Sequence, residues 1–168
     1  MKFLFSDIVF QEVPNEISLA FFITGCPLRC QGCHSPELRN KNLGNILTDE
    51  SFKSNIEGYK NYITCVLFMG GEWEESELKH KLTIIKEEYP NLKTCLYTGE
   101  KDVSNELKEL LTYLKTGEYN ENFGGLDKLS TNQNFINIQT SENLNHLFRT
   151  SSHDSTNSKA DRPKNPIH

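Results

Sequence analysis

The chain has 168 residues, the usual length of one domain. It carries 18 basic and 23 acidic side chains, a net charge of −5, which disfavours non-specific binding to nucleic acids or anionic membranes. Five cysteines, three of them clustered, argue against a disulfide framework and predict a reducing, cytoplasmic setting. The sequence has no apolar run of membrane-spanning length, and Asp7 follows the start too closely for a signal peptide.

The first part of the chain predicts a buried strand that ends at a cysteine. Residues 2–13 alternate apolar and polar side chains and predict a strand or hairpin arm, and residues 14–16 predict a turn. Residues 17–23 are apolar and aromatic, as in the first strand of a buried core. Because Thr24 and Gly25 interrupt this run, Cys26 lies at the carboxyl end of the strand.

Helical and strand patterns then alternate. Helices are predicted from the N-cap Thr48, over 76–89 and over 102–111, and strands over 63–69, 93–97 and 113–116. This alternation predicts an α/β fold with a parallel sheet and right-handed crossovers. A Gly-rich loop and a short edge strand at 135–138 follow. We therefore predict a folded domain over 1–139 and a disordered tail over 140–168, where core-forming residues are nearly absent.

Three cysteines, Cys26, Cys30 and Cys33, stand in one loop with the spacing Cys-x₃-Cys-x₂-Cys. Thiolates select zinc, copper(I) or iron–sulfur clusters, and structural zinc usually takes four ligands in two separated pairs. The sequence has no second Cys-x-x-Cys pair. Three thiolates on a cubane cluster leave one iron open, so we predict a [4Fe-4S] cluster. The alternative is a non-catalytic metal module, either an electron carrier or a zinc site that also uses His34.

A second motif, Gly70-Gly71-Glu72, follows the strand at 63–69 and therefore lies on the same rim as the cysteine loop. Glycines let the backbone approach a ligand closely, and the Glu72 carboxylate can pair with an ammonium group. Thr98 ends the next strand on this rim and is assigned to the same site. For both positions a simple turn after a strand is the alternative.

The segment from Gly25 to His34, together with the later Gly-Gly-Glu, resembles the radical S-adenosylmethionine enzymes. More narrowly, it is similar to the proteins that activate anaerobic ribonucleoside-triphosphate reductases. The resemblance covers residues 1–140 and implies an incomplete β/α barrel. It also implies that S-adenosylmethionine binds the open iron and is cleaved to a 5′-deoxyadenosyl radical, which generates a glycyl radical on the reductase.

The same resemblance implies roles for individual residues. Gly70, Gly71 and Glu72 would hold the amino group of the methionine moiety, and His34 would lie near the adenine. Gly32, also assigned to the cofactor site, replaces an aromatic residue of the wider superfamily. Residues 13–16 stand where many activating proteins have a Gly-Pro-Gly turn, which indicates a divergent branch.

The implied partners are the catalytic subunit of the anaerobic reductase and an electron donor such as flavodoxin or ferredoxin, with no nucleic acid and no membrane. The sequence leaves homodimer formation open. Two further enzymatic readings stay open at this point. One is activation of a different glycyl-radical enzyme, and the other is modification of a small molecule by a short enzyme like the deazaguanine synthases.

Overall fold

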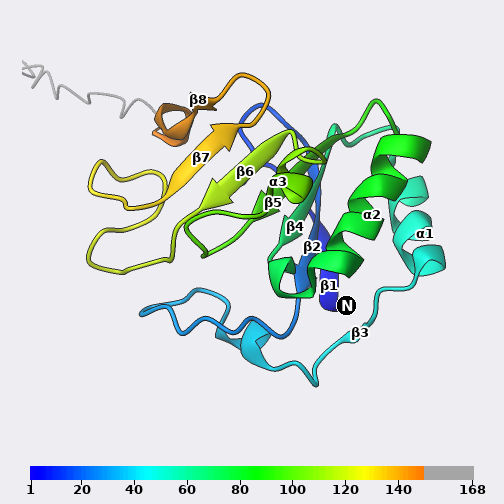
Figure 1. Cartoon of the computed structure of the whole chain (residues 1–168), viewed down its shortest axis with the longest axis horizontal. Coiled ribbons are helices and arrows are strands. Elements are labelled where there is room, and N and C mark those ends of the chain that lie inside the picture. Colours follow the sequence, from blue (N-terminus) through cyan, green and yellow to red (C-terminus); the bar gives the residue numbers. More distant parts are fainter. Residues whose placement is uncertain (150–168) are drawn as a thin grey trace, which may run out of the picture.

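The computed structural model describes residues 1–149, which form a mixed α/β fold around one sheet (Figure 1). In order across the sheet, its eight strands are β3 (Asn45–Ile46), β1 (Lys2–Val9), β2 (Ser18–Ile23), β4 (Cys65–Met69), β5 (Lys93–Tyr97), β6 (Tyr113–Thr116), β7 (Asn134–Asn137) and β8 (Glu142–Asn143). The pairs β2–β4, β4–β5 and β5–β6 are parallel, and the outer pairs are antiparallel. The predicted parallel sheet is thus confirmed for the centre only.

The central strands are buried on both faces, as their continuous apolar sequences predict. Along β2, Leu19 and Phe21 point to one face of the sheet, whereas Ala20 points to the other. Val66 and Leu67 divide between the faces in the same way along β4. This period of two places an apolar layer on each side of the sheet.

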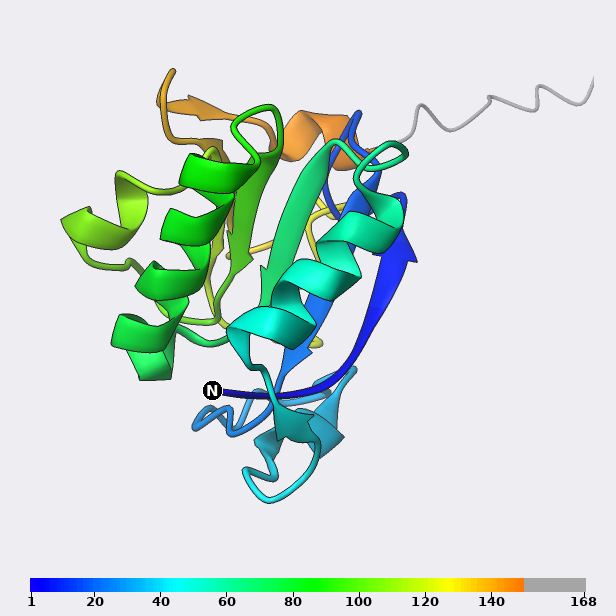
Figure 2. The same ribbon diagram turned by 90° about the vertical axis from the view of Figure 1, so that its right-hand side faces the viewer.

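Helices cover one face of the sheet (Figures 1 and 2): α1 (Asp49–Tyr59), α2 (Glu75–Glu88) and the short α3 (Asn105–Lys108). The predicted N-cap is confirmed, because the Thr48 side chain accepts a hydrogen bond of 3.1 Å from the backbone N–H of Ser51. Phe52 of α1 and Leu82 of α2 are fully buried in the larger apolar cluster of the molecule. Packing of these amphipathic faces is the main source of helix stability.

Loops cover the opposite face, where the second apolar cluster lies. Val13 comes from the connection between β1 and β2, and Leu126 comes from the connection between β6 and β7. Phe148 belongs to a 3-10 helix, η3 (Asn145–Phe148), and its ring contacts Phe135 with a centroid distance of 5.1 Å. Loops often carry binding residues, and the cavity of this molecule lies on the loop-covered face.

Two predicted boundaries change in the structure. The helix predicted over 102–111 is limited to α3, because the Asp102 side chain binds the Val103 N–H and Ser104 caps the helix by binding the Leu107 N–H. The expected disorder does not hold for residues 140–149, which form β8 and η3. There, Asn145 accepts a hydrogen bond of 2.7 Å from the Phe135 N–H. The rest of the predicted tail, 150–168, lies outside the described residues.

None of the helices formed within residues 1–149 combines the length and the apolar composition required to cross a membrane.

Candidate functional site

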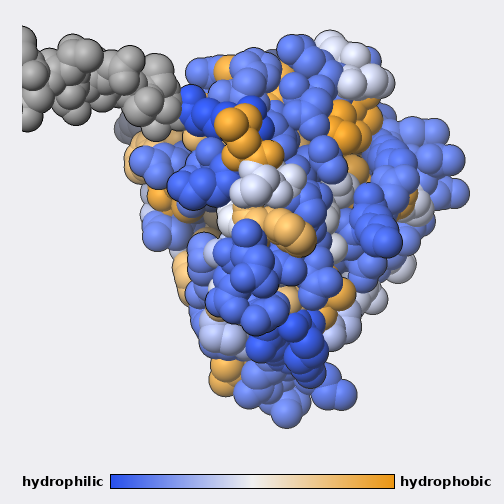
Figure 3. Space-filling model, turned by 90° about the vertical axis from the view of Figure 1, so that its left-hand side faces the viewer, coloured by the Kyte–Doolittle hydropathy of each residue, from blue (hydrophilic) through white to orange (hydrophobic). Residues whose placement is uncertain are grey.

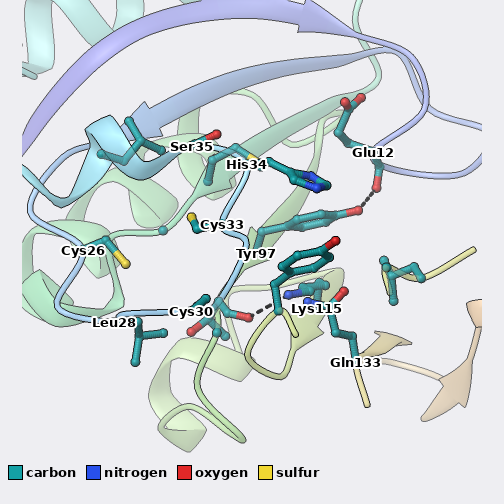
Figure 4. Close-up of a pocket in the computed structure, with 18 of the residues that line it drawn as sticks. Glu12, Cys26, Leu28, Cys30, Cys33, His34, Ser35, Tyr97, Lys115 and Gln133 are labelled. Atoms are coloured by element: carbon teal, nitrogen blue, oxygen red, sulfur yellow. Dashed lines mark hydrogen bonds between the residues drawn. The ribbon is translucent and has the colours of Figure 1, made fainter. Parts of the chain in front are cut away.

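A cavity of about 1010 Å³ opens at the carboxyl ends of β2, β4, β5 and β6, the usual place for ligands in α/β folds (Figure 4). Most of the predicted site residues line it: Cys26, Cys30, Cys33, His34, Gly70, Glu72 and Thr98. Gly32 and Gly71 do not line the cavity, although each is part of a segment that does. The two motifs found in the sequence therefore share one cavity.

The cysteine loop runs from β2 to a short 3-10 helix, η1 (Pro36–Arg39), and is tied down at its start. The backbone N–H groups of Gly25 and Cys26 both donate to the carbonyl of Leu38, at 2.7 and 3.1 Å. Arg39 Nη2 donates to the carbonyl of Cys30 at 2.9 Å. All three cysteines of the loop are half-buried and unbridged. Figure 4 shows them spread along the loop on one side of the cavity.

Burial raises the pKa of the Cys26 thiol. A backbone hydrogen bond from Leu28 lowers this pKa, and the nearby Glu72 carboxylate raises it. Burial likewise raises the pKa of the Cys30 thiol, and a backbone hydrogen bond from Tyr119 offsets part of the rise. A metal that binds these thiols therefore displaces protons. Within residues 1–149, no three His, Cys, Asp or Glu side chains already converge as the ligands of a single ion do.

The Gly-Gly-Glu motif links β4 to the 3-10 helix η2 (Glu72–Glu74). Gly70 and Gly71 have φ angles of 89° and 110°, which favour glycine. A Cβ atom on Gly70 would lie 2.5 Å from the ring of Trp73, so the indole also requires glycine at this position. The motif thus fixes both the backbone turn and the place of Trp73 at the cavity wall.

Glu72 presents one paired and one unpaired oxygen. Its Oε1 accepts a hydrogen bond of 2.6 Å from Thr98 Oγ1, whereas its buried Oε2 has no hydrogen-bond partner within residues 1–149. Burial raises the pKa of this carboxyl group, and the hydrogen bond from Thr98 acts against the rise. A buried carboxylate oxygen of this kind is satisfied by a donor, above all a cationic one, from a ligand in the cavity.

His34 and Gly32 both contact the segment that follows β6. The exposed His34 ring lies 4.7 Å from the Tyr119 ring, measured between centroids. Gly32 has a φ angle of 72°, and a Cβ atom there would lie 3.4 Å from the Tyr119 ring and 3.0 Å from Glu121. Gly32 thus makes room for a neighbouring aromatic residue and does not itself line the cavity.

Lys115, a residue that the sequence motifs do not mark, is buried at the cavity (Figure 4). Its Nζ donates to the carbonyls of Gly117 at 2.8 Å and of Thr98 at 3.4 Å. Burial lowers its pKa to about 8, while Cys30 and Glu72 act in the opposite direction, so the ammonium lies between the two motifs. A lysine inside a predicted strand that ends on this rim was the available sequence signal.

The family described as "4Fe-4S single cluster domain" matches residues 17–136, which is most of the chain. The chain belongs to this family. The matched range contains the cysteine loop, the Gly-Gly-Glu motif and Lys115. The predicted iron–sulfur character is thereby confirmed at the level of the family, and three thiols at one cavity rim are a donor set that suits such a cluster.

The chain is also similar to the anaerobic ribonucleoside-triphosphate reductase-activating protein of Enterobacteria phage T4. The two sequences are 26% identical over 112 residues, which cover 62% of this chain and 72% of the phage protein. This similarity confirms the resemblance on which the sequence-based predictions rest.

Proposed function

We propose that this iron–sulfur protein is a radical S-adenosylmethionine enzyme that generates a glycyl radical on an anaerobic ribonucleoside-triphosphate reductase. One observation carries the proposal: three thiols face the same cavity as a buried carboxylate oxygen of Glu72 that has no partner in the described part of the chain. The similarity to the phage reductase-activating protein supports the choice of target. The open sheet with helices on one face would then be the partial β/α barrel implied by the sequence.

The cysteine loop would hold the cluster through Cys26, Cys30 and Cys33, which leaves one iron free of protein ligands. Glu72 Oε2 would accept a hydrogen bond from the amino group of S-adenosylmethionine, and Thr98 would hold this carboxylate in place through its other oxygen. When bound, the cluster supplies the electron for cleavage of the sulfonium C–S bond, with methionine and a 5′-deoxyadenosyl radical as products.

Other residues of the cavity would orient the nucleoside and exclude water. Gly70 gives the ligand access to backbone groups that a side chain would cover. Trp73 and Leu28 supply apolar surface that keeps solvent from a reactive radical. We place the adenine beside His34, whose ring is exposed toward the cavity next to Tyr119.

The proposed partner is a protein segment, because the cavity lies under loops and, within residues 1–149, no second layer of helices closes it. The face of the molecule from which the loops between β6 and β7 project is mainly hydrophilic, with separate apolar spots (Figure 3). Such a surface suits a partner that associates and leaves again. A small electron-transfer protein, flavodoxin or ferredoxin, would reduce the cluster in the cytoplasm.

The test is anaerobic reconstitution with iron and sulfide, followed by addition of dithionite and S-adenosylmethionine and chromatographic measurement of 5′-deoxyadenosine. We expect cluster absorbance and 5′-deoxyadenosine from the unmodified chain. With a reductase added, we expect the electron paramagnetic resonance signal of a glycyl radical. A cluster-loaded protein that forms no 5′-deoxyadenosine would refute the enzyme proposal. Formation of 5′-deoxyadenosine without a glycyl radical would refute only the choice of target.

A further inference from the structure

A short segment after β6 lies directly on the cysteine loop. We call residues 118–121 the clasp. Gln31 Nε2 donates a hydrogen bond of 2.7 Å to Glu121 Oε1, and the His34 and Tyr119 rings are in contact. Gly32 leaves the space in which the clasp side chains sit, since any side chain there would meet Glu121 and Tyr119. The clasp thus contacts the cysteine loop on both sides of Gly32.

The clasp is itself fixed at its beginning. The carbonyl of Gly117 accepts hydrogen bonds from Lys115 Nζ at 2.8 Å and from Gln133 Nε2 at 3.1 Å. The carbonyl of Glu118 accepts a hydrogen bond of 2.9 Å from Asn132 Nδ2. Lys115 and Gln133 are buried, so these bonds are protected from competition by water. The clasp therefore starts from a rigid base.

The cysteine loop, by contrast, has little regular structure between its anchors. Within it, one backbone hydrogen bond joins the Cys33 N–H to the Cys30 carbonyl at 3.4 Å, a long distance for such a bond. The anchors at Leu38 act on Cys26, at the start of the loop, and Arg39 Nη2 holds the Cys30 carbonyl at 2.9 Å from η1. Cys30 and Cys33 therefore depend on contacts from outside the loop for their position.

We propose that the clasp positions Cys30 and Cys33 before a cluster is present, and that Lys115 is a positioning residue which ties the clasp to the Gly-Gly-Glu side of the cavity. Lys115 Nζ bridges the carbonyls of Gly117 and Thr98, and Thr98 Oγ1 holds Glu72. A continuous set of contacts thus runs from Glu72 to the cysteine loop. Restricting the apo loop in this way lowers the entropy that cluster binding must remove.

This inference relies on the proposed function only for the identity of the cysteines as cluster ligands, and its test uses neither a cluster nor S-adenosylmethionine. The reduced apo chain is treated with iodoacetamide, and the alkylation rates of Cys26, Cys30 and Cys33 are measured separately by peptide mass spectrometry. Cys26 is the internal reference, because its anchor at Leu38 lies apart from the clasp.

We expect Tyr119→Ala and Glu121→Ala each to raise the rates at Cys30 and Cys33 relative to Cys26 by about fivefold, the population change that loss of one net stabilising contact allows. Tyr119→Phe keeps the ring against His34 and should retain the wild-type ratio. Tyr62→Ala removes the same side chain from a site that is 73% exposed and serves as the matched control. Lys115→Met should raise the same ratio and also accelerate hydrogen exchange in residues 118–121.

Unchanged ratios in Tyr119→Ala and Glu121→Ala would overturn the proposal. An equal increase at all three cysteines, Cys26 included, would also overturn it, because that pattern reports general loosening of the fold. Raised ratios in a protein that fails to cleave S-adenosylmethionine would support the clasp while counting against the proposed function, so the two failures are distinguishable.

Discussion

On the helix-covered face of the sheet, Phe21, Phe52 and Phe68 pack ring against ring, with centroid distances of 5.0 to 5.9 Å, and all three are fully buried. On the loop-covered face, Glu72 keeps an unpaired buried oxygen and Lys115 is held by carbonyl groups alone within residues 1–149. The first face is dominated by apolar packing. On the second, the Glu72 oxygen without a partner among residues 1–149 is available to a donor from a ligand.

This difference indicates how the domain divides stability from chemistry. Aromatic and aliphatic burial stabilises the fold by about 25 cal/mol per Å² and needs no particular partner. Buried polar groups such as Glu72 cost free energy until a ligand pairs with them. The helices supply the apolar burial that stabilises the fold. The glycine-rich loops at the strand ends supply the buried polar groups that await a ligand. Changes on the two faces should therefore have separable consequences.

The largest functional effect is expected from Cys30→Ala. If the proposed function holds, loss of one of the three proposed cluster ligands should abolish the cluster and the formation of 5′-deoxyadenosine, while the thermal unfolding midpoint stays near that of the apo wild type. Absorption spectra and chromatography measure the two functional readouts. Cys95→Ala is the control, because Cys95 is fully buried among the β-strands and should leave the cluster intact.

Phe52→Ala should have the largest effect on stability. Removing a fully buried phenylalanine from the aromatic cluster costs about 3–5 kcal/mol of unfolding free energy, measured by urea denaturation. Tyr59→Ala in the same helix affects a side chain that is 44% exposed and should cost less than about 1 kcal/mol. If Phe52→Ala also changed the relative alkylation rates of the three loop cysteines, the two faces would not be separable.

Gly70→Ala, on the loop-covered face, should lower the free energy of unfolding by less than Phe52→Ala does. The φ angle of 89° is strained for alanine, and the new Cβ atom would collide with the Trp73 ring, so we expect a loss of about 1–3 kcal/mol. Gly58→Ala is the matched change in the helix α1, where a Cβ atom has nothing within 4 Å. There alanine should stabilise the protein by about 0.5–1 kcal/mol. Equal effects at the two glycines would contradict the assigned geometry.

Glu72→Gln should produce the smallest of these changes in stability, visible in its pH dependence. The pKa of Glu72 is raised by burial in the folded state, so the folded protein binds more protons than the unfolded chain above the ordinary pKa of 4.5. Stability of the apo protein therefore falls as pH rises from 4.5 toward the raised pKa. The variant should lack this fall, so that it is more stable than the wild type at pH 7. Parallel stability curves for the two proteins would show that Glu72 is not desolvated.

Much of this arrangement could be predicted from local sequence. The predicted strands at 93–97 and 113–116 coincide with β5 and β6, whose ends are marked in the sequence by the turn residues Gly99 and Gly117. The cysteine spacing and the glycines before Glu72 marked both halves of the cavity. These signals are local, since each depends on neighbours along the chain.

The remaining features depend on contacts between distant segments. Tyr119 belongs to a connection without periodic pattern, and its contact with the cysteine loop exists only once β6 delivers it there. Asn145 looks like part of a polar tail, yet its side chain bonds the backbone of Gln133 and Phe135 and holds η3 on the sheet. The two hydrogen bonds of Asn145 cannot be predicted from composition, because a hydrogen bond to a distant backbone group leaves no periodic pattern in the sequence.

The marginal strands β3 and β8 each pair with a neighbour over only two residues. On one side, β3 covers only Lys2 and Phe3, so within residues 1–149 the rest of β1, up to Val9, has a strand partner on one side only. A strand from another chain would find most of its ladder there. On the other side, β7 and β8 offer only four and two residues, so the two edges of the sheet differ in the length of backbone that they present.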